Sequence, residues 1–156
     1  IKGGVPMSEL SEYLKEKEQE QVNQEVHWNK VRDEWIQTVG NFLVLIKSWL
    51  ADEIQDGLIQ IEECTEVIDE EHLGSYSVSS LKLHAIGKVL SLRPVGRLII
   101  GAQGRVDLES QSSGERIILL YLSAEEGWVY LPNNERGNYP KLSQPVFKEL
   151  IKGLLS

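Results

Sequence analysis

Cysteine is almost absent from this chain of 156 residues. Cys64 is the single one, which excludes an internal disulfide and a zinc site built from several cysteines. Glutamates at positions 62, 63 and 66 surround it, and their negative charge would raise the pKa of the thiol rather than lower it. We therefore interpret Cys64 as a small, half-buried strand residue and not as a reactive thiolate.

Long hydrophobic runs and the pattern of a secretion signal are also missing. The best apolar run covers residues 42–46, whereas a membrane-spanning helix needs about 18 apolar residues. The N-terminus lacks the order of charged, apolar and small residues that a signal peptide has. We expect a cytoplasmic protein with no membrane partner. We also expect residues 1–7 to be a vector remnant, with Met7 as the natural start, and residues 8–156 to form a single domain.

Proline is absent from residues 8–54, and Gly40 is the only glycine there. The segment up to about Glu25 is polar and charged, whereas the segment after it carries large apolar residues at steps of three or four, the period of a helix. We predict a separate N-terminal helix, then a long core helix from about Glu25 to Ile54 that Gly57 stops. The core-facing residues of this helix are Trp28, Val31, Trp35, Val39, Phe42, Ile46 and Trp49.

The hydrophobic period changes to two after Leu58, which indicates strands. Pro94-Val95-Gly96 has the composition of a turn, and a long strand is predicted from Leu98 to Leu108. Ser143 followed by Pro145 is typical of the start of a helix. The order of elements predicts an α+β fold with N-terminal helices, an antiparallel β-meander of about five to six strands, and a C-terminal helix.

The charges of this acidic chain are sorted by region. Its formal net charge is −8, which argues against a protein whose main task is to coat nucleic acid. Residues 48–81 contain nine acids and neither Lys nor Arg, whereas residues 82–106 contain five bases and no acid. Two adjacent strand regions of opposite sign either pair with each other inside the fold or face different partners.

The basic region could form an anion-binding face on the predicted strands. Bases of a nucleic acid would need aromatic side chains to stack on, and no Phe, Tyr or Trp lies between Tyr76 and Tyr121. Asp107 shares the predicted face, and the strand near Glu62 and Glu66 could pair with the basic residues. We therefore do not expect nucleic acid as a partner. The residues of this candidate face are Lys82, His84, Arg97, Gln103 and Arg105.

Three further patterns lack the geometry of a chemical site. The segment Gly96–Arg105 has the glycines of a phosphate loop, but neither Lys-Ser/Thr nor a helix follows. We interpret Gly101 and Gly104 as marking a bulge or a place where a tryptophan lies over the sheet. Asp69–His72 places metal-capable side chains at consecutive positions, which point in different directions. We predict no catalytic residue, no cofactor and no metal site, which favours a protein that is not an enzyme.

The segment Trp128–Leu142 is a long polar connection rich in Tyr, Asn and Pro. Connections of this length in a small domain are often functional, and Trp, Tyr and Arg carry much of the energy of protein interfaces. The alternative is a loop held on the C-terminal helix by Tyr139. The leading site hypothesis is a partner-binding surface made of this loop and the charged N-terminal helix. The candidate partner-binding residues of the loop are Trp128, Tyr130, Asn133, Asn134, Arg136 and Tyr139.

The leading hypothesis for the function is a small protein-interaction module: an adaptor, an inhibitor or immunity-type protein, or a subunit of an assembly. The acidic charge suits a partner with a basic site, and a homo-oligomer is compatible with this hypothesis. The first alternative is an anion- or nucleic-acid-binding module that uses the basic strand face. The second is a small enzyme or ligand-binding protein with a pocket between the core helix and the sheet.

Overall fold

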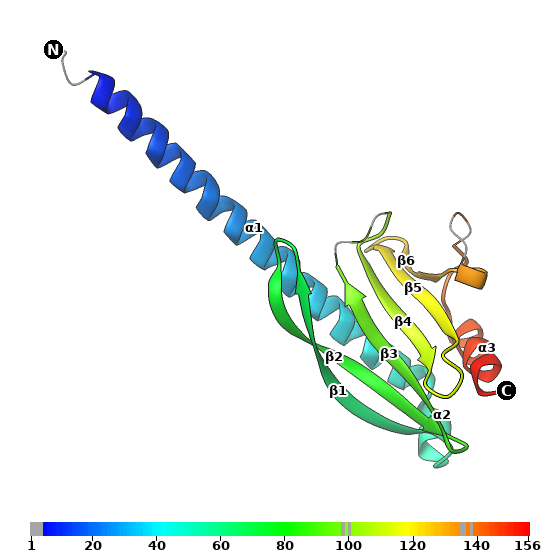
Figure 1. Ribbon diagram of the computed structural model, residues 1–156. Helices are drawn as coiled ribbons and strands as arrows, with labels where there is room; N and C mark the ends of the chain where they lie inside the picture. Colours follow the sequence, from blue (N-terminus) through cyan, green and yellow to red (C-terminus); the bar gives the residue numbers. More distant parts are fainter. Residues whose placement is uncertain (1–4, 98, 100, 135–136, 138) are drawn as a thin grey trace.

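The computed structural model describes residues 5–97, 99, 101–134, 137 and 139–156. Over these residues, a long helix, a six-stranded antiparallel sheet and a C-terminal helix make up the fold (Figure 1), which confirms the predicted α+β class. The helices are α1 (Val5–Trp49), α2 (Ala51–Gln55) and α3 (Gln144–Leu155), with a short 3-10 helix η1 (Pro132–Asn134). The strands are β1 (Gln60–Glu70), β2 (Gly74–Ala85), β3 (Lys88–Gly96), β4 (Gly104–Ser110), β5 (Arg116–Ser123) and β6 (Gly127–Tyr130).

The first helix is continuous, so the prediction of a separate N-terminal helix is wrong. α1 runs through the polar segment without interruption, because Glu, Lys and Gln have good helix propensity and no proline stands between Ser8 and Trp49. The backbone departs from helical geometry at Leu50 (φ −100°, ψ 12°), after which the short α2 follows. The core helix therefore ends at Trp49 rather than at Ile54.

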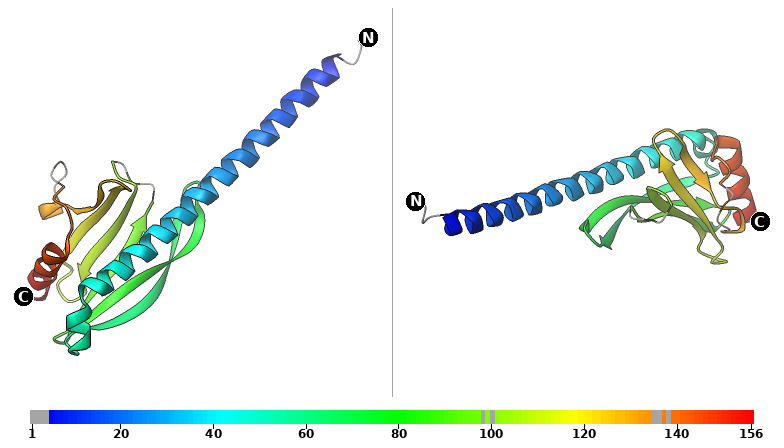
Figure 2. Two further views of the ribbon diagram at one scale, coloured as in Figure 1. Left: turned by 180° about the vertical axis from the view of Figure 1, so that it is seen from behind. Right: turned by 90° about the horizontal axis from the view of Figure 1, so that it is seen from above.

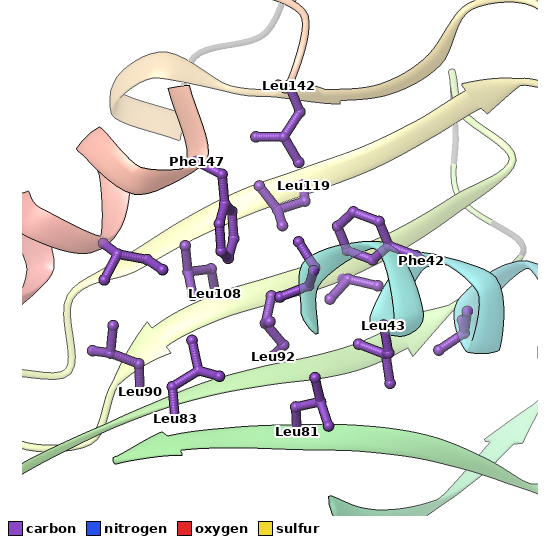
Figure 3. Packing of buried hydrophobic residues seen from close by; sticks show 14 of the residues in the cluster. Phe42, Leu43, Leu81, Leu83, Leu90, Leu92, Leu108, Leu119, Leu142 and Phe147 are labelled. Atoms are coloured by element: carbon purple, nitrogen blue, oxygen red, sulfur yellow. The ribbon is translucent and has the colours of Figure 1, made fainter. Parts of the chain in front are cut away.

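The strands form a meander in which each strand pairs with the next one along the chain. The C-terminal half of α1 and the whole of α3 cover the same face of this sheet (Figure 2). Phe42 and Leu43 from α1 and Phe147 from α3 point toward the leucines of the strands (Figure 3). The core thus lies between the helices and one sheet face, and the opposite face of the sheet is called the outer face below.

Pro94 lies inside β3, so the predicted turn at Pro94–Gly96 is wrong. The pairing of β3 with β4 shifts its register between Pro94 and Gly96. Such an irregularity accommodates a proline, which has no N–H to donate to a neighbouring strand. The Pro-Val-Gly sequence that suggested a turn therefore belongs to an irregular part of β3.

The chain reverses after β3, between residues 97 and 103, and the predicted long strand from Leu98 to Leu108 is reduced to β4. An isolated bridge joins Ile99 to Ala102, and Gly101 has a φ of +84°. A glycine tolerates this left-handed conformation because it has no Cβ. Leu98 and Ile100 lie outside the described residues.

β1 and β2 form a long ribbon that extends past β3. β2 pairs with β3 only through residues 81–85, whereas it pairs with β1 through its whole length. Ser80 and Leu81 are both buried, so the alternation of inward and outward residues changes phase where the ribbon leaves β3. At the tip of the ribbon, the ring of His72 stacks on Trp28 of α1, with ring centroids 4.7 Å apart and planes 10° apart.

Trp35 joins the long helix to the centre of the sheet. Its side chain is 1% exposed, and its ring lies so close over Gly104 that a Cβ there would collide with it. This contact confirms the prediction that a tryptophan lies over one of the glycines of this region. Gly101 has a different role, since its Cβ would meet open space and its conformation serves the turn.

Glu70 ties the end of β1 to the end of β3. Its carboxylate accepts hydrogen bonds from the backbone N–H of Arg97, at 2.9 and 3.1 Å, and from the hydroxyl of Tyr76. Burial, followed by the hydrogen bond to Glu70, raises the pKa of the Tyr76 hydroxyl. A Cβ at Gly96 would collide with the same carboxylate, so this glycine makes room for the contact.

Replacing Trp35 by alanine should remove the main link between α1 and the sheet. Truncating a large buried aromatic residue costs about 3–5 kcal/mol, because a cavity is left behind. We expect Trp35→Ala to lower the free energy of unfolding in urea by that amount, whereas Gln37→Ala on the exposed side of α1 should change it by less than about 0.5 kcal/mol. A Trp35→Ala melting temperature within a few degrees of wild type would contradict the assignment.

Ile86 and Gly87 form a two-residue hairpin turn between β2 and β3, and both have positive φ values, 47° and 73°. This turn favours Asn-Gly, and a β-branched residue at its first position is strained. The Ile86 side chain is also 77% exposed. We expect Ile86→Asn to raise the free energy of unfolding by about 1 kcal/mol, the low end of the strain at such positions. Ile86→Val keeps the branching and should show no gain.

Candidate functional site

The N-terminal part of α1 projects from the body of the molecule (Figure 1). All residues from 9 to 27 are exposed, and this segment is called the arm. Contact with the body begins at Trp28, which packs at the margin of the core and against His72. The arm is the largest part of the described chain that has no tertiary support.

The arm carries an apolar patch near its tip. Leu10, Tyr13 and Leu14 are spaced three and four residues apart, which places them within about 100° of one another on the helix. Each is between 51% and 59% exposed. Lys17 and Gln21 continue the same face, so the patch is short and ends after two helical turns.

The charge of the arm is strongly negative. Residues 9–27 include six glutamates and two lysines, which gives a formal net charge of −4. The described ion pair within it, Lys17 with Glu20 at 3.3 Å, is exposed to solvent and contributes little. The arm therefore presents an apolar patch within an acidic surface.

An apolar groove lies at the opposite end of the molecule from the arm. It has a volume of about 410 Å³ and is formed by α2, α3 and the turn between β2 and β3. Its apolar lining consists of Leu50, Ile59, Ile86, Ile151 and Leu155, and its polar lining consists of Glu53, Lys148, Lys152 and Ser156.

Lysines dominate the charge around this groove. Lys148 Nζ lies 3.0 Å from the Glu53 carboxylate, and this hydrogen bond holds the pKa of Glu53 below its usual range. Lys88 Nζ donates to the Leu155 carbonyl oxygen at 3.0 Å, while Lys152 is exposed. Among the side chains that line the groove, two lysines therefore stand against one carboxylate, and Lys148 is paired with it.

The structure separates the six residues predicted to bind a partner. Trp128 stacks on Phe42, with ring centroids 4.0 Å apart, and Tyr130 packs against the core. Asn133 is exposed with a φ of 53°, and Tyr139 is 37% exposed. Asn134 belongs to η1, and Arg136 lies outside the described residues. Two of the three aromatic rings of this set, Trp128 and Tyr130, therefore face inward, and the partner-binding role of the loop stays a prediction.

The predicted anion-binding residues divide between two places. Lys82 and His84 lie on β2 and Arg105 on β4, whereas Arg97 and Gln103 line a small hollow beside Trp35 and Tyr121. His84 bonds to Glu62 at 2.8 Å. Pairing between the two charge blocks is thus observed for His84 with Glu62, whereas Arg105 pairs with Asp107, outside the acidic block. Anion binding stays untested.

Asp107 is the centre of the basic part of the outer face. It is 1% exposed and lies 2.8 Å from Arg105, 3.7 Å from Arg116 and 3.9 Å from Arg93. The hydrogen bonds from Arg105 use two nitrogens and both carboxylate oxygens, the geometry that fixes a guanidinium most firmly. Three of the arginines therefore share one acid that lies outside the acidic block.

The space between the long helix and the ribbon holds no set of residues with an evident chemistry. A hollow of about 400 Å³ there is lined by Lys47, Glu63, Cys64 and Ser80 among others, and Lys47 pairs with Glu63. Burial and the nearby Glu62 carboxylate raise the pKa of the Cys64 thiol. No group of three or more metal-capable side chains occurs among the described residues. None of the described helices is long and apolar enough to cross a membrane.

Sequence reasoning missed the groove and its most unusual residue. The signal was present in Ile86-Gly87, where an isoleucine stands at a turn position that favours Asn or Asp. The other lining residues come from two segments, 50–59 and 148–156, about 90 to 105 positions apart, which no local pattern connects.

Comparisons with known proteins give no further guide to this site. No protein-family model, no curated protein and no solved structure matches the chain.

The ion pairs of the outer face should prevent binding to nucleic acid. Because Asp107 engages three arginines and the chain has a net charge of −8, few cations are left to release counterions from a phosphate backbone. We expect fluorescence anisotropy to detect no binding of duplex DNA or single-stranded RNA at about 150 mM salt. Micromolar binding that Arg97→Ala/Arg105→Ala abolishes would contradict this expectation.

Proposed function

We propose that this protein is a non-catalytic interaction module that binds a protein partner through the arm. The observation that carries the proposal is the exposure of every residue from 9 to 27 in a helix that is continuous with the core. The arm offers a partner an acidic helix with an apolar patch at Leu10, Tyr13 and Leu14. The body holds the base of the helix in a fixed direction.

The exposed arm is physically more consistent with a bound state than with a free one. A polar helix without tertiary contacts is marginal in water, and the arm makes its described side-chain contacts only within itself. Burying one large apolar side chain contributes about 1.5–3 kcal/mol. A partner that covers the three apolar residues of the patch would therefore stabilise the helix as it binds.

Anion binding and catalysis have less support from the other candidate surfaces than protein binding has from the arm. His84 and Arg105 have carboxylate partners. The hollow beside α1 is lined by an ion pair and by a thiol whose pKa is raised. The arm has no such internal partner for its apolar residues. Of the candidate surfaces, the arm is therefore the one on which a partner would bury the most exposed apolar area.

Deleting residues 8–20 should leave the body intact. The deleted segment has no described contact with the sheet or with α3. We therefore expect the melting temperature to change by no more than about 2 °C, which corresponds to at most about 1 kcal/mol in a domain of this size. Circular dichroism at 222 nm measures both the lost helix and the melting temperature. A large loss of stability would show that the arm is docked on the body.

The binding role is tested with two variants that add the same charge to opposite sides of the arm. Leu10→Asp/Leu14→Asp alters the apolar patch, whereas Gln19→Asp/Asn23→Asp alters the opposite side at the same spacing. Tagged full-length proteins are used to capture partners from the source cells, and each candidate partner is then purified and titrated against all three forms. We expect direct binding to wild type and to the second variant, and a loss of about tenfold or more in the first. Equal binding by all three forms would overturn the proposal.

A further inference from the structure

We propose that the partner of the arm is a second copy of this chain, and that the arm of one copy docks in the groove formed by α2, α3 and the Ile86 turn of the other. This inference rests on the proposed function and deepens it by naming the partner. It connects two surfaces that the fold leaves open at opposite ends of the molecule (Figures 1 and 2).

The arm cannot reach the groove of its own chain. α1 is one uninterrupted helix from Val5 to Trp49, and the groove lies beside the residues that follow its C-terminal end. A helix rises 1.5 Å per residue, so the tip of the arm lies roughly 60 Å along the helix from Leu50. Contact between the two surfaces therefore requires two molecules.

The two surfaces match in their apolar content. Leu10, Tyr13 and Leu14 form the three-and-four spacing with which an amphipathic helix anchors itself in a groove. The groove is lined by five aliphatic side chains and opens to solvent. Leu50, Ile59 and Ile151 form the buried floor of the groove, and Ile86 is its exposed apolar side chain. Docking would cover Ile86 and this floor with the patch of the other copy.

The two surfaces also match in charge. The arm has a formal net charge of −4 over residues 9–27, with Glu9, Glu12 and Glu16 close to the patch. Lys148 and Lys152 line the groove with Glu53, which pairs with Lys148, so Lys152 carries the excess positive charge of the lining. Opposite charge at the rim steers association and sets the orientation of the helix.

An isoleucine at position 86 has no evident benefit for the stability of the isolated molecule. It has a φ of 47° and is 77% exposed, so it is strained in the backbone and unfavourable in water at once. Strained residues of this kind occur at sites of function. In the docked pair, Ile86 would contact the apolar patch of the arm and its side chain would leave water.

Pairing of two arms with each other is the competing form of self-association. A coiled coil needs apolar residues at each heptad seam position, but the seam that begins with Leu10 and Leu14 continues with Lys17, Gln21 and Gln24. Two arms would also bring charges of −4 together. The groove offers both the apolar surface and the opposite charge that a second arm lacks.

The arm and the groove are different surfaces, so the contact is heterologous. Such contacts close into a ring or a reciprocal pair, or they continue as a chain of molecules. This property allows a complementation experiment. The arm variant Leu10→Asp/Leu14→Asp keeps an intact groove, and the groove variant Ile86→Asn/Lys152→Glu keeps an intact arm. All four positions are exposed, so both full-length variants should fold.

Sedimentation velocity from micromolar to millimolar concentration measures the association. We expect wild type to self-associate, each variant alone to do so at least about tenfold more weakly, and an equimolar mixture of the two to form a 1:1 heterodimer. The control Gln19→Asp/Asn23→Asp should associate as wild type does. Added salt should weaken the contact, because charge at an exposed rim is screened.

Two results would overturn the inference. If wild type is monomeric over the whole range, the partner is not a second copy, and the capture experiment with the same arm variant still decides the proposed function. If wild type associates but the mixture of variants does not, the arms pair with each other or another surface is used. Ile86→Asn alone adds a second readout, since it should strengthen the fold and weaken the association.

Discussion

The contact between Trp35 and Gly104 is the constraint on which the arrangement of the molecule depends. It places the indole ring of α1 directly on the backbone of β4, near the middle of the meander. Val39, Phe42 and Ile46 follow on the same side of the helix and are buried in turn, which aligns α1 along the sheet. The helix reaches the end of its support at Trp28, against His72, and everything before it extends into solvent. The direction of the arm is therefore set by packing at residues that do not belong to it.

The distribution of charge accords with the surfaces that this packing leaves open. β1 is an edge strand in the described sheet and carries five acids and no base, which opposes pairing with another copy of itself. The arm is also acidic, while lysines gather around the groove beside α3. Association through edge strands or through two arms is thus disfavoured by like charge. The arm and the groove remain as the complementary pair, which is the basis for inferring a head-to-tail contact.

At the turn between β2 and β3, Ile86 lowers the stability of the fold and serves the proposed contact with the arm. A protein selected only for folding would carry Asn or Asp at position 86, because these residues tolerate a positive φ. Isoleucine costs backbone strain and exposes an apolar side chain beside the groove. On the outer face, by contrast, the charged side chains are paired, because Asp107 lies within 3.9 Å of three arginines. At the two ends of the molecule, the arm exposes Leu10, Tyr13 and Leu14 and the turn exposes Ile86.

The sequence by itself determined the class of fold, the buried face of α1 and the polar character of the arm, because these depend on residues close together in the chain. The spacing of the large apolar residues Trp28, Trp35, Phe42 and Trp49 predicts one face of a helix. The alternation of apolar and polar residues after Leu58 predicts strands. Tertiary structure alone decided that Pro94 belongs to a bulged strand, that Trp128 turns inward onto Phe42, and that Asp107 collects three arginines. It also brought Leu50, Ile86 and Ile151 to one groove. These outcomes depend on strand register and on helix placement, which bring together residues far apart in sequence and leave no periodic trace in the chain.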